Sequence, residues 1–154
     1  MTQAKYQMPA LFFMLAAAML AAALLSQHLV AMDLYVHDTY YVISHTFIFW
    51  VLSVYFVACA LLYLVFEKVT RKRMSPGLGD VHFWLSTIAV GILVHTLHKM
   101  SAFGTDVARA QAAMHSLAEV GFVAFFGFFI AQIVFVANVI WSLFRTQSST
   151  STEP

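Results

Sequence analysis

The histidines are the residues of this sequence whose type and spacing point to chemistry. Imidazole is a good ligand for iron, copper and zinc. His95 and His98 are three residues apart, so a helix presents both of them on one face. Gly91 lies one turn before His95 on the same face, where it leaves the flat space that a haem ring needs against a helix. This pattern favours metal ligation, with haem binding as one form of it.

His45 is a further candidate, because it lies in a long apolar run, two turns after His37 and Asp38. An ionisable side chain inside an apolar span is costly and is a functional candidate by default. A hydrogen bond to a serine or a backbone carbonyl also satisfies a neutral imidazole, so a structural role is the alternative for His45 and His95. The sequence has no Cys-x-x-Cys-His motif, so covalent attachment of a haem is not expected.

These side chains must be positioned by membrane-spanning helices. The chain of 154 residues is 62% hydrophobic and only 10% charged, which excludes an ordinary soluble domain. Four apolar runs are each long enough to cross a hydrocarbon core of about 30 Å. The predicted fold is an all-α integral membrane four-helix bundle, with residues 1–154 as a single domain. We expect helices over about 9–32, 43–67, 80–99 and 107–144, and a disordered tail over 146–154.

Local signals suggest how the helices begin and pack. The first helix is rich in alanine, which allows a neighbouring helix to approach closely. Residues 33–41 are expected to form a short loop, with Asp38 or Thr39 as the N-cap of the second helix. Asp80 is the expected N-cap of the third helix.

The basic residues predict the orientation. If the four helices alternate in direction, Lys5, Arg145 and the basic cluster over 68–73 fall on one side of the membrane. The positive-inside rule makes that side cytoplasmic. Both termini are therefore expected in the cytoplasm, in a multi-pass protein of a bacterial-type inner membrane. All the histidines except His82 then lie in the outer half.

Residues 37–45 read His-Asp-Thr-Tyr-Tyr-Val-Ile-Ser-His. This stretch resembles the His-Asp-Thr-Tyr-Tyr-Val-Val-Ala-His stretch of haem–copper oxidase subunit I. The similarity continues in the same order and spacing, because residues 81–84 resemble the start of that family's next helix and residues 92–104 its end and following loop. Residues 140–145 resemble the last helix. Nearly the whole chain is thus similar to the last four of the family's twelve helices.

The resemblance implies roles by position. The residue that matches His45 is the axial ligand of a haem, and the residues that match His37 and Asp38 bind a redox-inactive metal near the outer surface. Phe47 stands where the family usually has a second haem-ligating histidine. The resemblance does not extend to the helices that carry the copper ligands, so this chain alone is not expected to reduce oxygen to water. Whether it is an enzyme stays open.

The family's twelve helices form a ring with pseudo-threefold symmetry, of which four helices are one third. The resemblance therefore implies a homo-oligomer, with a trimer favoured over a dimer, in keeping with the closed symmetry of most homo-oligomers. We also expect contact with the lipid bilayer and with a redox partner protein, and no nucleic-acid partner.

We therefore expect a membrane protein that binds b-type haem through His45 and has an electron-transfer or related redox role. The sixth iron ligand would be His95 or His98, from the same or a neighbouring subunit. One alternative is a cofactor-free accessory subunit of a respiratory complex. The other is a membrane copper-binding protein that combines the outer histidines with thioethers, which suit Cu(I). The methionines available for it are Met32, Met100 and Met114.

Overall fold

The computed structural model describes residues 7–26, 32–36, 39–101 and 107–145. This part of the chain contains the helices α1 (Gln7–Leu25), α2 (His45–Thr70), α3 (Pro76–Ser101) and α4 (Val107–Phe144). Strands β1 (Met32–Val36) and β2 (Thr39–Ile43) pair as an antiparallel sheet between α1 and α2. All four helices are long and apolar enough to cross a membrane. The predicted four-helix membrane bundle, a multi-pass protein, is therefore confirmed.

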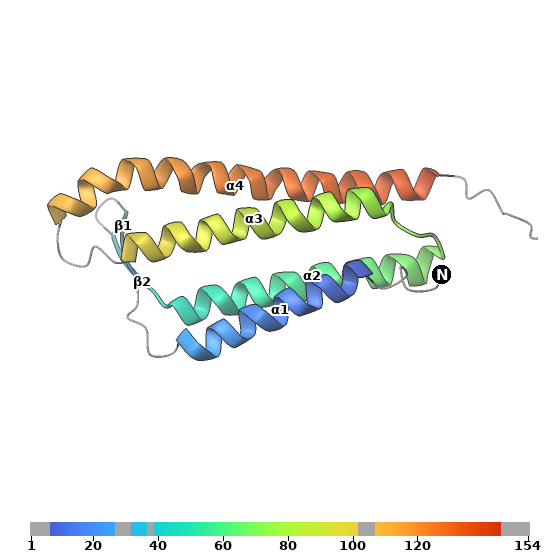
Figure 1. Cartoon of the computed structure of the whole chain (residues 1–154), viewed down its shortest axis with the longest axis horizontal. Coiled ribbons are helices and arrows are strands. Elements are labelled where there is room, and N and C mark those ends of the chain that lie inside the picture. The colour runs from blue at the N-terminus through green and yellow to red at the C-terminus, as the bar shows by residue number, and fades with distance from the viewer. Residues whose placement is uncertain (1–6, 27–31, 37–38, 102–106, 146–154) are drawn as a thin grey trace, which may run out of the picture.

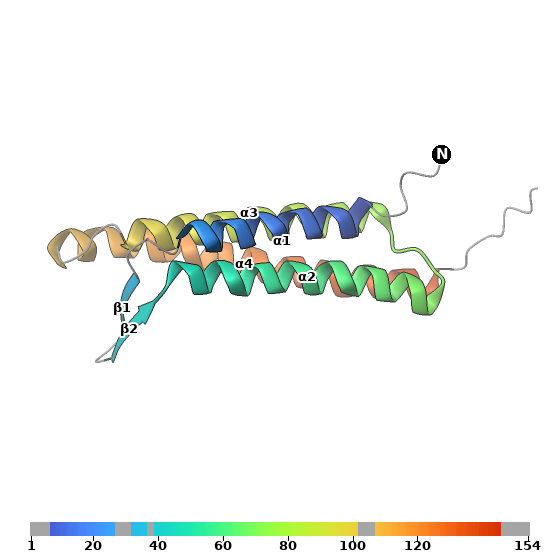
Figure 2. The same cartoon turned by 90° about the horizontal axis from the view of Figure 1, so that it is seen from below.

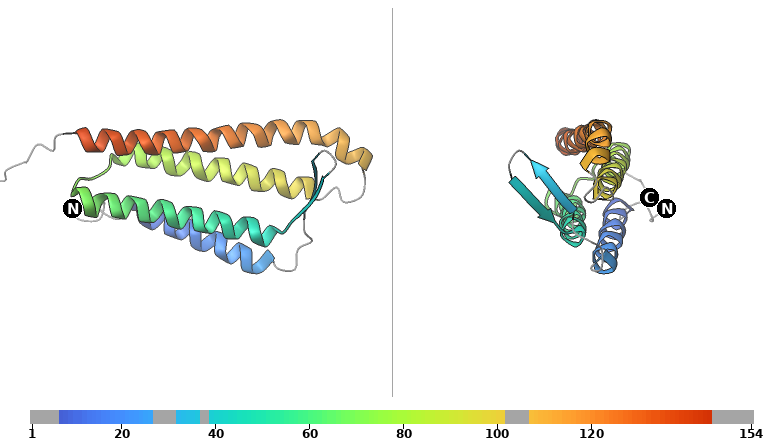
Figure 3. Two further views of the ribbon diagram at one scale, coloured as in Figure 1. Left: turned by 180° about the vertical axis from the view of Figure 1, so that it is seen from behind. Right: turned by 90° about the vertical axis from the view of Figure 1, so that its left-hand side faces the viewer.

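The four helices lie along one long axis and alternate in direction (Figure 1). The start of α1, the connection between α2 and α3, and the end of α4 lie together at one end of the bundle, which we name the α2–α3 end (Figures 1 and 2). The two strands lie at the opposite end, named the hairpin end, where β1 contacts α3 (Figure 3). Residues at the two ends of the bundle therefore face opposite surfaces of a membrane.

The bundle is built from two helix pairs, α1 with α2 and α3 with α4. Ala16 and Ala23 on α1 are buried, and the Ser53 hydroxyl on α2 donates a hydrogen bond to the Ala16 carbonyl at 3.0 Å. Small side chains let helix backbones approach closely in this way. In the second pair, a Cβ atom placed on Gly127 would lie 3.7 Å from the Cβ of Ala89. Close backbone approach therefore holds each pair together.

Phe12 on α1 joins the two pairs toward the α2–α3 end, and its side chain is fully buried. The centre of its ring lies 6.2 Å from that of Phe56 and 5.7 Å from that of Tyr63, both on α2. On α3, the ring of Phe83 meets it edge-on at 5.2 Å. Aromatic pairs at such distances contribute beyond the area that they bury. This aromatic cluster connects the two pairs at this end.

Polar side chains add a second connection between the pairs, nearer the middle of the helices. The Gln132 amide on α4 donates a hydrogen bond to the Tyr55 hydroxyl on α2 at 2.8 Å. The same hydroxyl lies 3.4 Å from the Ser86 hydroxyl on α3. Such hydrogen bonds between membrane helices fix their register, because no water is present to compete for the polar groups.

The hairpin is the main departure from the sequence-based prediction. The first helix was expected to reach residue 32, but α1 ends at Leu25, and residues 32–36 form β1. The predicted loop over 33–41 instead contributes to both strands, with Tyr35 paired to Tyr40. Tyrosine, valine and isoleucine dominate these residues, and they favour strands. Aromatic and β-branched side chains therefore outweigh the apolar run that suggested a longer helix.

Both N-cap predictions that the structure tests are wrong. Thr39 begins β2, and the N-cap of α2 is Ser44, whose side chain makes no capping hydrogen bond. The third helix begins at Pro76, so Asp80 lies within it. Proline is favoured at the first helical position, where its missing N–H costs nothing. Asp38 and the predicted disordered tail over 146–154 lie outside the described residues.

Candidate functional site

His45 is the first residue of α2, directly after the hairpin. Its side chain is only 8% exposed, and neither ring nitrogen has a hydrogen-bond partner within the described structure. Leaving a buried polar group unpaired costs about 1–3 kcal/mol. The alternative role for His45 was a structural one, in which a serine or a backbone carbonyl forms a hydrogen bond with its ring. No such hydrogen bond is present among the described residues. A buried imidazole with both nitrogens free is suited to bind a metal.

A short chain of hydroxyl groups positions this part of α2. The Ser26 hydroxyl, just after α1, donates to the Ala23 carbonyl at 3.0 Å. Its oxygen also lies 3.2 Å from the Thr46 hydroxyl. The Ser26 hydroxyl proton is already donated to the Ala23 carbonyl, so the Thr46 hydroxyl is the donor in the bond between the two hydroxyl groups. These two bonds attach the end of α1 to the residue next to His45, and no pattern in the sequence predicts them.

His98 on α3 is brought against His45. The centres of the two imidazole rings are 6.1 Å apart, and the ring planes are inclined at 66°. A metal bonded to a ring nitrogen at about 2.1 Å lies ~3.2 Å from the ring centre, so two imidazoles on one metal have centres up to about 6.4 Å apart. The observed separation is within this limit. The separation of the two rings, which come from different helices, is therefore compatible with ligation of one metal ion by both.

His95 and Gly91 are not part of this pair. Both are exposed on α3, and among the described rings it is His98 that contacts His45. A Cβ atom placed on Gly91 would meet nothing within 4 Å, so the space beside the helix there is open. The structure thus brings together two of the histidines that the sequence singled out and leaves a third, with the glycine, on the outside of α3.

Several predicted site residues lie outside the described structure. These include His37 and Asp38, the predicted outer metal site. The side chains of the three methionines considered for copper, Met32, Met100 and Met114, also lie outside it. The outer metal site and the methionine ligands stay predictions.

Within the described ranges, no three His, Cys, Asp or Glu side chains gather closely enough to hold a metal ion. A bare zinc or copper ion ordinarily needs three or four such ligands. A haem iron has different needs, because the porphyrin supplies four nitrogens and the protein adds one or two axial ligands. The His45–His98 pair, with its free and buried nitrogens on His45, therefore fits a haem better than it fits a bare ion.

His82 on α3 is a second buried histidine, and it was not predicted as a site residue. It is fully buried toward the α2–α3 end, with Nδ1 3.1 Å from the Tyr63 hydroxyl. The centre of its ring lies 5.2 Å from that of Phe12 and 5.1 Å from that of Phe135. Nε2 has no hydrogen-bond partner within the described part. With aromatic rings around it, His82 fits a core histidine that connects α2 to α3.

Comparison with known proteins places the chain in a family. The family described as Cytochrome C and Quinol oxidase polypeptide I matches residues 1–135, a range that contains His45 and His98. Over 120 residues the chain is 27% identical to the alternative cytochrome c oxidase subunit 1 of Bradyrhizobium diazoefficiens, covering 73% of this chain and 20% of the relative. No solved structure matches significantly.

Two further relatives are each named cytochrome c oxidase subunit 1. The one from Synechocystis sp. is 27% identical over 116 residues, which are 74% of this chain and 21% of the relative. The one from Thermostichus vulcanus is 30% identical over 112 residues, which are 70% of this chain and 20% of the relative. The chain thus spans about one fifth of the length of these relatives. It belongs to the cytochrome c and quinol oxidase polypeptide I family.

Proposed function

We propose that this haem–copper oxidase-related membrane protein binds b-type haem through His45 and His98 and has an electron-transfer or related redox role. The observation that carries the proposal is the buried His45 ring, whose two nitrogens have no described hydrogen-bond partner. The ring of His98, at 6.1 Å, would be the second ligand of the haem iron. A bound haem would supply an iron that gains and loses one electron.

The chain's own residues would tune this site in two ways. His45 is buried, so it keeps water from the iron on its side, and water exclusion and axial ligation are two of the factors that set a haem's potential. His45 and His98 come from different helix pairs. Their joint ligation would hold the pairs together at the hairpin end, as the Phe12 cluster does at the α2–α3 end. Binding of haem would therefore also stabilise the bundle.

Haem extraction tests the proposal. Acidified acetone should remove the pigment from the purified protein, because the sequence offers no site for covalent attachment. Pyridine haemochrome analysis should then identify haem b. A colourless protein with stoichiometric copper would instead support the copper-binding alternative, and a colourless metal-free protein would support the accessory subunit.

The orientation belongs to the same proposal, with the α2–α3 end on the cytoplasmic side of a bacterial inner membrane. The described basic residues at this end are Lys68, Arg71, Lys72, Arg73 and Arg145. Such residues accumulate on the cytoplasmic side. The redox site would then face the outer side of the membrane.

Cysteine labelling tests the orientation. In a Cys59→Ala background, Ser44→Cys at the hairpin end should react with an impermeant thiol reagent in intact cells, and Gly77→Cys at the α2–α3 end should react only after lysis. Both positions are exposed, and a side chain at Gly77 meets nothing within 4 Å. The opposite labelling pattern would contradict the orientation.

We also propose that copies of the chain assemble, with a trimer favoured over a dimer. The support is the twelve-helix ring of the family that the sequence resembles, of which four helices are one third. Native mass spectrometry in a mild detergent should show three chains per particle. A particle that contains only one chain would contradict this proposal.

A further inference from the structure

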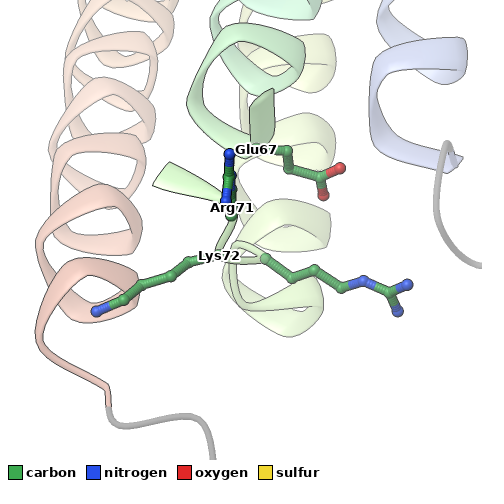
Figure 4. Close-up of a pocket in the computed structure, with 4 residues that line it drawn as sticks. Glu67, Arg71 and Lys72 are labelled. Atoms are coloured by element: carbon green, nitrogen blue, oxygen red, sulfur yellow. The ribbon is translucent and has the colours of Figure 1, made fainter. Parts of the chain in front are cut away.

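A pocket of about 360 Å³ lies at the α2–α3 end, where α2 stops and the chain turns toward α3. It is lined by Glu67, Arg71, Lys72 and Arg73 (Figure 4). We name it the basic pocket, since its lining holds three cationic side chains and one carboxylate. Nothing in the proposed haem chemistry uses these residues, because the His45–His98 pair lies at the opposite end of the bundle.

The positive charge of the basic pocket is only partly balanced within the described part of the chain, by the single carboxylate of Glu67. The Lys72 ammonium donates to the Leu143 carbonyl and so extends toward the end of α4 (Figure 4). This contact fixes its position and leaves its charge unpaired. Arg71 and Arg73 are exposed, and their guanidinium groups form no ion pair with the described residues. The pocket therefore presents a net positive surface to an anion.

Arg71 is an unusual residue for the position it occupies. It follows the last residue of α2 in the left-handed conformation, with φ of 55°, and its N–H bonds to the Glu67 carbonyl at 3.0 Å. Glycine is favoured at such a position because it has no Cβ to clash. The backbone of Arg71 is therefore strained in this conformation, and a glycine would not be. Its guanidinium group, which lines the pocket, is what the arginine adds.

The pocket lies at the depth of lipid headgroups. Helix α2 has 26 residues, which gives it a length of about 39 Å. The hydrocarbon core of a bilayer is only about 30 Å thick. The end of α2 and the basic pocket after it therefore reach the headgroup layer, where guanidinium groups bind phosphate with paired hydrogen bonds.

We propose that the basic pocket binds the phosphate of an anionic phospholipid in the leaflet at the α2–α3 end. A net negative headgroup is required, because a headgroup amine would bring a further positive charge to the arginines. Glu67 is the one acceptor among the lining residues, and it can accept a hydrogen bond from a headgroup hydroxyl. The preferred lipid class is thus one with a glycerol headgroup.

Lipid titration of the full-length protein in detergent, followed by native mass spectrometry, tests the proposal with phosphatidylglycerol and phosphatidylcholine as probes. A basic residue near an anionic leaflet contributes about fivefold to affinity, so Arg71→Gln with Arg73→Gln should weaken phosphatidylglycerol binding by roughly 25-fold. Arg145→Gln is the control, because it removes one positive charge at the same end outside the pocket, as each of the two pocket substitutions does. It should change binding less than about twofold.

Arg71→Gly separates lipid binding from folding. Glycine suits the left-handed conformation, so this variant should keep or raise the denaturation midpoint and still lose about fivefold in phosphatidylglycerol binding. Equal losses of phosphatidylglycerol binding in the double variant and in Arg145→Gln would contradict binding at the basic pocket. Equal binding of the two lipids, or displacement of phosphatidylglycerol by millimolar inorganic phosphate, would overturn the lipid assignment.

Discussion

Replacing His45 with alanine should remove haem from the protein, lowering the haem content per chain by more than about tenfold. His45 is the buried ligand of the proposed pair, and alanine offers no nitrogen to the iron. The exposed His98 alone would leave the haem held from one side. Pyridine haemochrome analysis of equal amounts of purified, membrane-inserted protein gives the ratio. Full haem content with an unchanged spectrum in this variant would contradict ligation by His45.

Two further histidine variants give the controls. His98→Ala should retain part of the haem and change its absorption spectrum from low-spin to high-spin, because one axial imidazole is lost. His95→Ala should leave the spectrum nearly unchanged, since its exposed side chain lies outside the His45–His98 pair. The reverse behaviour of these two variants would show that His95 is the sixth ligand.

Replacing Phe12 with alanine should destabilise the bundle by about 3–5 kcal/mol, the usual cost of removing a buried phenylalanine. Its ring contacts Phe56 and Tyr63 on α2 and Phe83 on α3. The substitution therefore removes packing between the two helix pairs. Denaturant titration of the purified protein in detergent, followed by circular dichroism, measures the change in the free energy of unfolding.

Phe122→Ala is the matched control for this prediction. Phe122 is 63% exposed on α4, and detergent or lipid can replace the contacts of its ring. The same substitution there should cost less than about 0.5 kcal/mol. Equal losses at the two positions would mean that Phe12 does not hold the pairs together.

The helices could be predicted from the sequence because a membrane span requires a long apolar run, and hydropathy reports this directly. The residues at which the helices begin and end depend on local residue preferences and on strand pairing, which hydropathy does not report. The apolar run of the first helix was expected to extend to about residue 32, yet the tyrosines and β-branched residues over 32–43 form a hairpin. A strand pairing is decided by the partner strand, which hydropathy does not report. The predicted helix therefore ran several residues beyond Leu25.

The site could be predicted only in part, for a geometric reason. The position of His45 within an apolar run marked it as a candidate. Whether His95 or His98 would meet it depends on how α2 and α3 rotate against each other, since the two side chains point about 60° apart around the α3 axis. Sequence spacing places both on one face but does not fix that rotation. The burial of His82 among rings from three helices likewise depends on how the helices pack, which the sequence alone does not show.

The low-temperature electron paramagnetic resonance spectrum of the oxidised protein tests most directly whether His45 and His98 hold one haem iron. Two axial imidazoles make ferric haem low-spin. We expect a low-spin ferric signal that accounts for the extracted haem and is absent from His45→Ala. A signal from high-spin haem alone, a copper signal without haem, or the absence of any signal would contradict the ligation of haem by this pair.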